Sequence, residues 1–121
     1  MNVCVVGLGY VGLPLAIQFA RSGANVLGLD IEPAKVDQIN AGHSYIKHIF
    51  HGTINEALKA NRLTASTDFA KVKDVGAVII CVPTPLNKNR EPDISFILET
   101  GRGIAPHLSK GTLVSLESTT Y

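Results

Sequence analysis

The sequence is short of several features that mark particular classes of protein. Its 121 residues contain no tryptophan, one methionine and two cysteines, and only 17% of them are charged. Two cysteines in separate apolar runs, with no CxxC pair, do not predict a disulfide framework. Eleven basic and ten acidic residues leave a formal net charge of +1, which predicts no nucleic-acid partner.

Long hydrophobic runs are also missing. The longest apolar stretches, such as GAVIICV at 76–82, are far shorter than the roughly 20 residues that cross a bilayer. The first predicted strand begins at residue 2, with no charged leader before it. We therefore expect no membrane partner and a cytoplasmic location, with Cys4 and Cys81 as small buried residues of a reduced protein.

Strand-like and helix-like segments alternate along the whole chain. Because such alternation implies right-handed crossovers, it predicts one domain, of the α/β class, with a parallel sheet of about five strands and helices on both faces. Asp68 and Asp93 are predicted helix caps. The expected strands span 2–7, 25–30, 63–67, 77–82 and 112–119; the helices span 10–23, 33–42, 54–62 and 94–108, with a helical turn at 68–74 and loops at 43–53 and 83–93.

The stretch VCVVGLGYVGLPLA at 3–16 holds three glycines between a predicted strand and a predicted helix. Gly7 would let the chain turn tightly out of the strand, and Gly12 would let the helix pack close to the sheet. Gly9, without a Cβ, would let a pyrophosphate approach the backbone, where free N–H groups and the helix dipole stabilise an anion. The fold predicted is therefore a Rossmann-like, doubly wound sheet.

Asp30 ends the second predicted strand, 18 residues after Gly12. A carboxylate there would accept hydrogen bonds from an adenosine ribose and repel a 2′-phosphate, which favours NAD over NADP. Lys35 could reach the same ribose. The alternative is a tight turn without a ligand, with Asp30 and Lys35 as solvated side chains.

The segment after the fourth strand, CVPTPLNKNREPD, would border the same crevice. Thr84 could offer a hydroxyl, and the prolines would hold the loop rigid against a flat ring; a stiff connection without a ligand is the alternative. His43, His48 and His51 lack a helical spacing and a nearby cysteine, so no metal site is predicted.

Taken together, VVGLGYVGLPLA, VPTP and ESTTY resemble the UDP-glucose/GDP-mannose dehydrogenase family. Within it, NAGHSYIKHI and CVPTPLNKNREPD are most similar to the bacterial UDP-N-acetylhexosamine 6-dehydrogenases. The resemblance implies an enzyme that oxidises the C6 alcohol of a UDP-sugar to a carboxylate with two NAD+, through a cysteine thioester. It implies a pyrophosphate loop formed by Gly7, Gly9, Tyr10, Val11 and Gly12, and ribose contacts from Asp30 and Lys35. It also implies that Val82, Pro83, Thr84 and Pro85 form the loop after the fourth strand and that Thr119 lies near the nicotinamide.

The family's catalytic cysteine lies beyond position 121, and neither Cys4 nor Cys81 matches its motif. We therefore expect residues 1–121 to be an incomplete NAD-binding domain, without catalytic and sugar-nucleotide domains, that binds NAD without turnover. An exposed strand edge would favour a homo-oligomer. Alternatives are the NAD-binding domain of a hydroxyacid or acyl-CoA type dehydrogenase, a methyltransferase, or a non-catalytic nucleotide-binding module.

Overall fold

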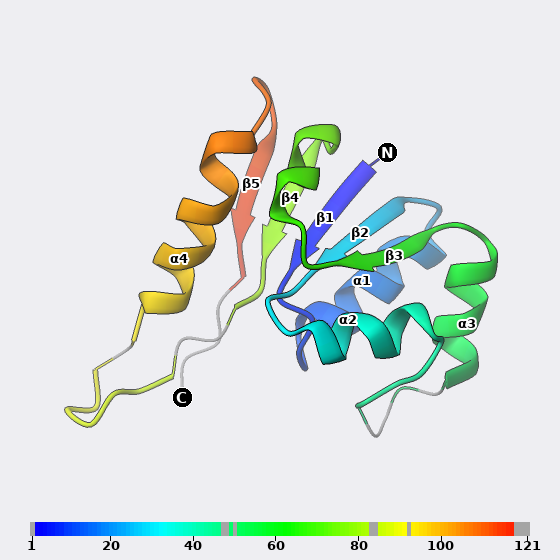
Figure 1. Cartoon of the computed structure of the whole chain (residues 1–121), viewed down its shortest axis with the longest axis horizontal. Coiled ribbons are helices and arrows are strands. Elements are labelled where there is room, and N and C mark those ends of the chain that lie inside the picture. Colours follow the sequence, from blue (N-terminus) through cyan, green and yellow to red (C-terminus); the bar gives the residue numbers. More distant parts are fainter. Residues whose placement is uncertain (1, 47–48, 50, 83–84, 92, 118–121) are drawn as a thin grey trace.

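The structure, a computed structural model, describes residues 2–46, 49, 51–82, 85–91 and 93–117, and for His51 the backbone alone. Five parallel strands form one sheet in the order β3-β2-β1-β4-β5 (Figure 1). They are β1 (Asn2–Val6), β2 (Asn25–Leu29), β3 (Leu63–Ser66), β4 (Ala77–Ile80) and β5 (Leu113–Leu116). The helices are α1 (Gly12–Arg21), α2 (Pro33–Asn40), α3 (His51–Lys59) and α4 (Ser95–Ile104), with 3-10 turns η1 (Phe69–Asp74) and η2 (Ala105–His107).

Each face of the sheet has its own apolar core. Val5 of β1 packs with Leu13 and Ile17 of α1 and with Ile39 of α2 on one face. Because side chains alternate along a strand, Cys4 and Val6 of β1 point to the other face, where the core includes Val72 of η1 and Ile104 of α4. Helices on both faces confirm the doubly wound architecture predicted from the alternation.

The order of the strands places the candidate site. β1 lies in the middle of the sheet, and the chain leaves it toward β2 on one side and returns to β4 on the other. Ligands of doubly wound sheets bind beyond the carboxyl ends of the strands at this reversal. The segments that follow β1, β2 and β4 therefore meet at one edge, the lower edge in Figure 1.

Several element boundaries differ from the predicted ones. α3 begins at His51, three residues before the predicted start at 54, in a segment whose mixed side chains gave no period. The predicted helix 94–108 is α4 followed by the separate turn η2, which contains Pro106. Asp93 precedes the N-cap position, which Ile94 occupies, although its carboxylate accepts the Ser95 N–H at 2.9 Å.

Asp68 caps η1 as predicted, because its carboxylate accepts the backbone N–H of Ala70 at 3.1 Å. β5 ends at Leu116, and residues 118–119 of the predicted fifth strand lie outside the described residues. In the part of the chain that the structure describes, every helix is too short or too polar to span a bilayer.

Candidate functional site

Two of the three motif glycines are required by close packing. Gly7 has a φ of +92°, and a Cβ there would lie 2.8 Å from the carbonyl oxygen of Cys81, the residue directly after β4. A Cβ on Gly12 would lie 1.6 Å from the carbonyl oxygen of Gly7. The loop between β1 and α1 is thus folded tightly on itself and against the neighbouring strand.

Gly9 stands in a different environment. A Cβ built there would meet no atom within 4 Å. The packing of the described residues therefore does not explain a glycine at this position. The open space fits the predicted role, in which the missing side chain leaves the backbone accessible to a pyrophosphate.

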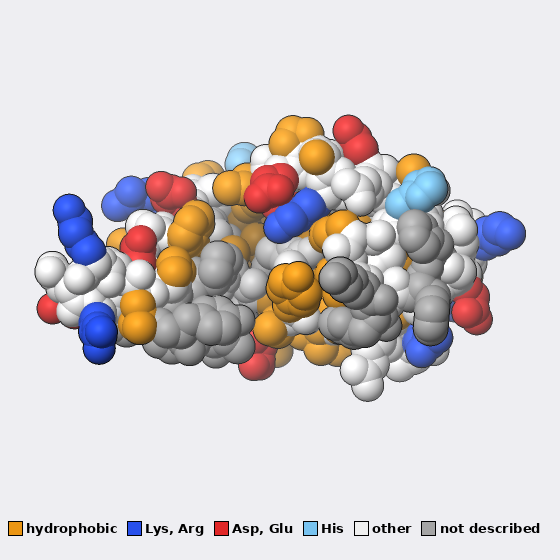
Figure 2. Space-filling view, turned by 90° about the horizontal axis from the view of Figure 1, so that it is seen from below, with side chains coloured by type: hydrophobic (Ala, Val, Ile, Leu, Met, Phe, Trp, Pro, Cys, Tyr) orange, Lys and Arg blue, Asp and Glu red, His pale blue; other side chains and the backbone are white. Residues whose placement is uncertain are grey.

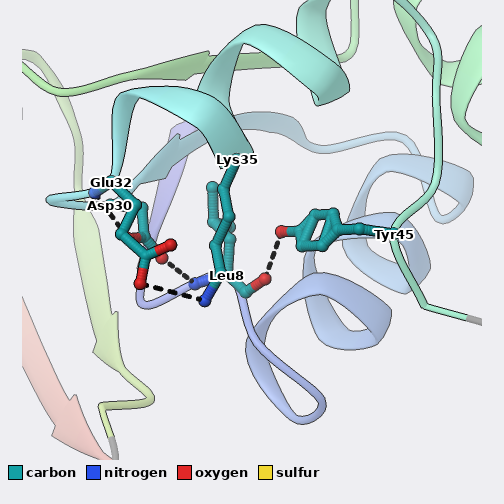
Figure 3. Close-up of polar contacts among 5 residues, drawn as sticks. All are labelled: Leu8, Asp30, Glu32, Lys35 and Tyr45. Atoms are coloured by element: carbon teal, nitrogen blue, oxygen red, sulfur yellow. Dashed lines mark hydrogen bonds and ion pairs between the residues drawn. The ribbon is translucent and has the colours of Figure 1, made fainter.

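Leu8, between these glycines, is held by three contacts, of which Figure 3 draws the two hydrogen bonds. Its buried side chain packs over Gly28 of β2, where a Cβ would lie 2.9 Å from a Leu8 methyl carbon. Its backbone N–H donates to Oδ2 of Asp30 at 2.9 Å. Its carbonyl oxygen accepts a hydrogen bond from the hydroxyl of Tyr45. The glycine-rich loop is therefore positioned before any ligand arrives.

Asp30 is a buried carboxylate, only 8% exposed. Besides the Leu8 N–H, it accepts the backbone N–H of Glu32 through Oδ1 at 3.0 Å. The alternative in which Asp30 is a solvated loop residue is therefore wrong. Each carboxylate oxygen can accept more than one hydrogen bond, so Asp30 keeps acceptor capacity for ribose hydroxyls.

These groups border a cavity of about 430 Å³, within the range of small-molecule sites, roughly 300–1,000 Å³. Its walls come from the loop 7–11, from Asp30, Glu32 and Lys35, from Cys81 and Val82 after β4, and from Phe69, Phe96, Glu99 and Thr100. Figure 2 views the molecule from below Figure 1. Hydrophobic side chains gather near the middle of that face, and a basic and an acidic side chain lie against each other above them.

The predicted site residues fall into three groups. Most of them line the cavity: Gly7, Gly9, Tyr10, Val11, Asp30, Lys35 and Val82. Gly12 lies behind the loop, and Pro85 is not among the lining residues. Pro83, Thr84 and Thr119 lie outside the described residues.

Sequence reasoning missed the role of Tyr45. It lies in the segment between α2 and α3, yet its hydroxyl reaches the Leu8 carbonyl 37 positions away. Its ring centroid lies 5.9 Å from the Lys35 ammonium nitrogen. Burial, with the carboxylates of Asp30 and Glu32 nearby, raises the pKa of the Tyr45 phenol above its usual value, so the hydroxyl remains a donor at neutral pH.

Neither cysteine is a candidate nucleophile. Burial raises the pKa of Cys4 to about 12, and burial together with Glu117 raises that of Cys81 to about 11. Both are therefore neutral thiols at pH 7, including Cys81, which borders the cavity. Among the described residues no group of three His, Cys, Asp or Glu is placed to hold a metal ion; His48 and the His51 side chain lie outside them.

Two other cavities lack the glycine-rich backbone and the buried carboxylate found at Asp30. One, of about 780 Å³, lies between α1 and α3 and is lined by Pro14, Ile17, Arg21 and Thr53, among others. The other, of about 710 Å³, lies over β4 and β5 and is mostly apolar, with Phe19, Ile79 and Leu113 in its walls. Neither combines glycine-rich backbone with a buried carboxylate, so the cavity at Asp30 is the candidate site.

A parallel sheet ordered 3-2-1-4-5, with a glycine-rich loop tied to an acid at the end of β2, defines a dinucleotide-binding domain. Residues 1–121 match the model of the UDP-glucose/GDP-mannose dehydrogenase family, NAD binding domain. The chain belongs to this family, and NAD is the cofactor of the matched domain. This confirms the predicted resemblance, fold and cofactor, and it rules against the methyltransferase and hydroxyacid dehydrogenase alternatives.

Individual members of the family are similar to the chain over almost all of its length. The chain is 40% identical over 119 residues to UDP-N-acetyl-D-mannosamine dehydrogenase of Escherichia coli K12, covering 98% of the chain and 28% of the relative. A solved UDP-D-ManNAc dehydrogenase of Pyrococcus horikoshii superposes with a TM-score of 0.92 at 38% identity, over 98% and 28% of the two chains. GDP-mannose dehydrogenase of Pseudomonas aeruginosa, solved as a ternary complex, gives 0.91 at 33%, with the same coverage. The chain thus spans about 28% of the length of these relatives.

Proposed function

We propose that this chain is the NAD-binding part of a nucleotide-sugar 6-dehydrogenase that oxidises the C6 alcohol of a UDP-sugar to a carboxylate with two NAD+. The family match supports the reaction class. The proposed substrate class, a UDP-N-acetylhexosamine, is supported by relatives from Escherichia coli and Campylobacter jejuni, both named UDP-N-acetyl-D-mannosamine dehydrogenase.

One observation carries the proposed cofactor contacts, the hydrogen bond between Leu8 N–H and Asp30. It joins the loop proposed to hold the pyrophosphate to the acid proposed to hold the ribose, so both ends of an adenosine diphosphate meet surfaces already fixed. In the proposal, the backbone of residues 7–12 binds the pyrophosphate, and Asp30 and Lys35 bind the ribose. Phe69 and Phe96, in the wall beyond Asp30, provide apolar surface for the adenine.

The nicotinamide end of the site is proposed on the family resemblance. Val82 lines the cavity directly after β4, and Pro85 follows shortly afterwards. We assign Val82, Pro83, Thr84, Pro85 and Thr119 to this end. Bound NAD+ would supply the hydride acceptor, while the residues of this chain bind it, orient it and keep water from its buried edge.

In this proposal the chain alone binds NAD without turnover. Both thiols of the described residues are neutral and sit in or beside the sheet, so no residue placed at the cavity can form the thioester. Residues 1–121 are one incomplete domain, and the sugar-nucleotide site and catalytic cysteine belong to further sequence.

We also propose self-association and a cytoplasmic location. β5 is an edge strand of the sheet, with Leu113 67% and Leu116 50% exposed. An unpaired apolar edge favours pairing with a second copy. The cytoplasmic location is supported by two free cysteines and by the use of NAD, a cofactor of intracellular metabolism.

Calorimetric titration of the 121-residue chain with NAD+ and NADH tests the proposed function. Saturable heat is expected from wild type and should be lost in Gly9→Val, because the side chain would occupy the space where the pyrophosphate approaches. Gly52→Val in α3, with equally open surroundings, no positive φ and a place away from the cavity, is the matched control for adding a side chain. Absence of heat at millimolar NAD+ from folded protein would overturn the proposal.

A further inference from the structure

The charged side chains around the cavity are unevenly divided by sign. Among the described lining residues, Asp30, Glu32 and Glu99 are acidic and Lys35 is the one cation. We call the part of the cavity wall formed by Asp30, Glu32 and Lys35 the rim. Any anionic group that binds at the rim therefore depends on Lys35 for a charged partner. How free the Lys35 ammonium is decides which ligands the rim accepts.

The Lys35 ammonium is held from two sides. Its Nζ lies 3.8 Å from Oε1 of Glu32, the N-cap residue of α2, and 5.9 Å from the ring centroid of Tyr45. Figure 3 shows the side chain running from α2 toward the glycine-rich loop, with Glu32 on one side and Tyr45 on the other. The aromatic ring can retain the ammonium through a cation–π interaction, while the carboxylate neutralises its charge.

The two acidic residues near Lys35, Asp30 and Glu32, have different structural roles. Asp30 is buried and accepts backbone N–H groups from Leu8 and Glu32, so it is part of the loop's architecture. The Glu32 side chain is 59% exposed and its carboxylate pairs with Lys35. Changing Glu32 therefore alters the charge at the rim without dismantling the glycine-rich loop.

We propose that Glu32 is a specificity-determining residue that excludes 2′-phosphorylated cofactors by pairing with Lys35. With Glu32 in place, Lys35 serves as a hydrogen-bond donor for a ribose hydroxyl but not as an unpaired cation for a phosphate. Without Glu32, the Tyr45 ring still retains the ammonium near the ribose, and the rim gains an available positive charge. This inference rests on the proposed NAD function.

NAD+ and NADP+ form a matched pair of ligands for the test, since they differ only at the ribose 2′ position. We would titrate the 121-residue chain with both at low ionic strength. In Glu32→Gln the ratio of NADP+ to NAD+ affinity is expected to rise about ten-fold, equivalent to about 1.4 kcal/mol. The Glu32 side chain is 59% exposed and that of Lys35 is 32% exposed, so solvent screens the pair and a much larger change is not expected.

Two further variants isolate the cause. Glu32→Gln/Lys35→Met should lose the gain in NADP+ affinity, because the released ammonium is gone. Glu56→Gln removes an exposed carboxylate from α3, away from the cavity, and should leave the ratio at the wild-type value. The gain should also shrink at about 1 M salt, where charges are screened beyond about 3 Å.

The outcomes separate this inference from the proposed function. If wild type binds NAD+ and Glu32→Gln leaves the ratio unchanged, the role of Glu32 is wrong while NAD binding stands. A gain that persists in the Lys35→Met background would also overturn it, since the effect would not pass through Lys35. If no variant binds either nucleotide, the proposed function itself fails.

Discussion

The α-carbon of Gly12 faces the carbonyl oxygen of Gly7 so closely that a Cβ at position 12 would lie 1.6 Å from that oxygen. The same Cβ would lie 3.3 Å from Cβ of Cys81. The start of α1 is therefore packed against the loop that precedes it and against the residue directly after β4, and only glycine permits this approach.

Gly12→Ala should consequently destabilise the fold. Because the obstructing atom is backbone, the loop must move, and we expect a loss of about 3 kcal/mol or more in the free energy of unfolding, at the upper end of overpacking effects. Urea denaturation measures it. Gly101→Ala in α4 is the matched control, since a Cβ there meets nothing within 4 Å. That control should gain about 0.5–1 kcal/mol from helix propensity; equal effects at the two positions would contradict the packing described.

Asp30→Asn should lower stability even without ligand. Both carboxylate oxygens accept backbone N–H groups, and an amide can offer an acceptor to only one of them. One of the two donors, either the buried Leu8 N–H or the part-buried Glu32 N–H, would then face an NH₂ group, at a cost of about 1–3 kcal/mol. Asp37→Asn, on the exposed side of α2, is the control and should stay within about 0.5 kcal/mol of wild type in the same denaturation experiment.

Stability should fall at alkaline pH because of Cys4. Its pKa is raised from 9.0 to about 12 by burial, so between these values the unfolded chain releases the thiol proton while the folded chain retains it. The unfolded state then binds fewer protons, and the free energy of unfolding decreases as pH rises through this window. The contribution is fully present below pH 9.0.

Urea denaturation from pH 8 to 11 would measure this slope. Cys4→Ala should start less stable, by about 1 kcal/mol for the small cavity, but with a shallower decline. Cys81 and Tyr45 also have raised pKa values and add to the slope in both proteins. Parallel curves for wild type and Cys4→Ala would show that Cys4 is not responsible.

Self-association should respond to the edge of the sheet. Leu113→Lys places a charge on the exposed edge strand β5 and should shift the light-scattering mass toward the monomer. Leu86→Lys alters a leucine that is 45% exposed in the loop before α4 and should leave the mass unchanged. A monomeric wild-type protein at high micromolar concentration would contradict the proposed self-association.

The sequence predicted the parts of the fold that depend on local pattern. Uniformly apolar runs such as 77–82 gave the strands, and the spacing of Gly7, Gly9 and Gly12 gave the loop and its neighbouring helix. Asp30 was predicted from its distance along the chain. Its bonds to Leu8 and Glu32 were not, because they depend on the three-dimensional approach of β2 to the loop.

Tyr45 shows where sequence reasoning ends. It lies in a segment with no apolar period, and its partner is the backbone carbonyl of Leu8, which any residue would present. Its ring contact with Lys35 likewise depends on how the segment after α2 folds back. The NAD contacts themselves, including those of Pro83, Thr84 and Thr119, stay predictions.

The central claim is that a dinucleotide binds where the glycine-rich loop meets Asp30, and amide-resolved NMR titration of the 121-residue chain with NAD+ tests it most directly. The largest saturable shifts are expected at the backbone N–H groups of Gly9, Tyr10 and Val11 and at Glu32. Shifts confined to the hollow lined by Ile17, Arg21 and Thr53, or no shifts at millimolar NAD+, would contradict the account.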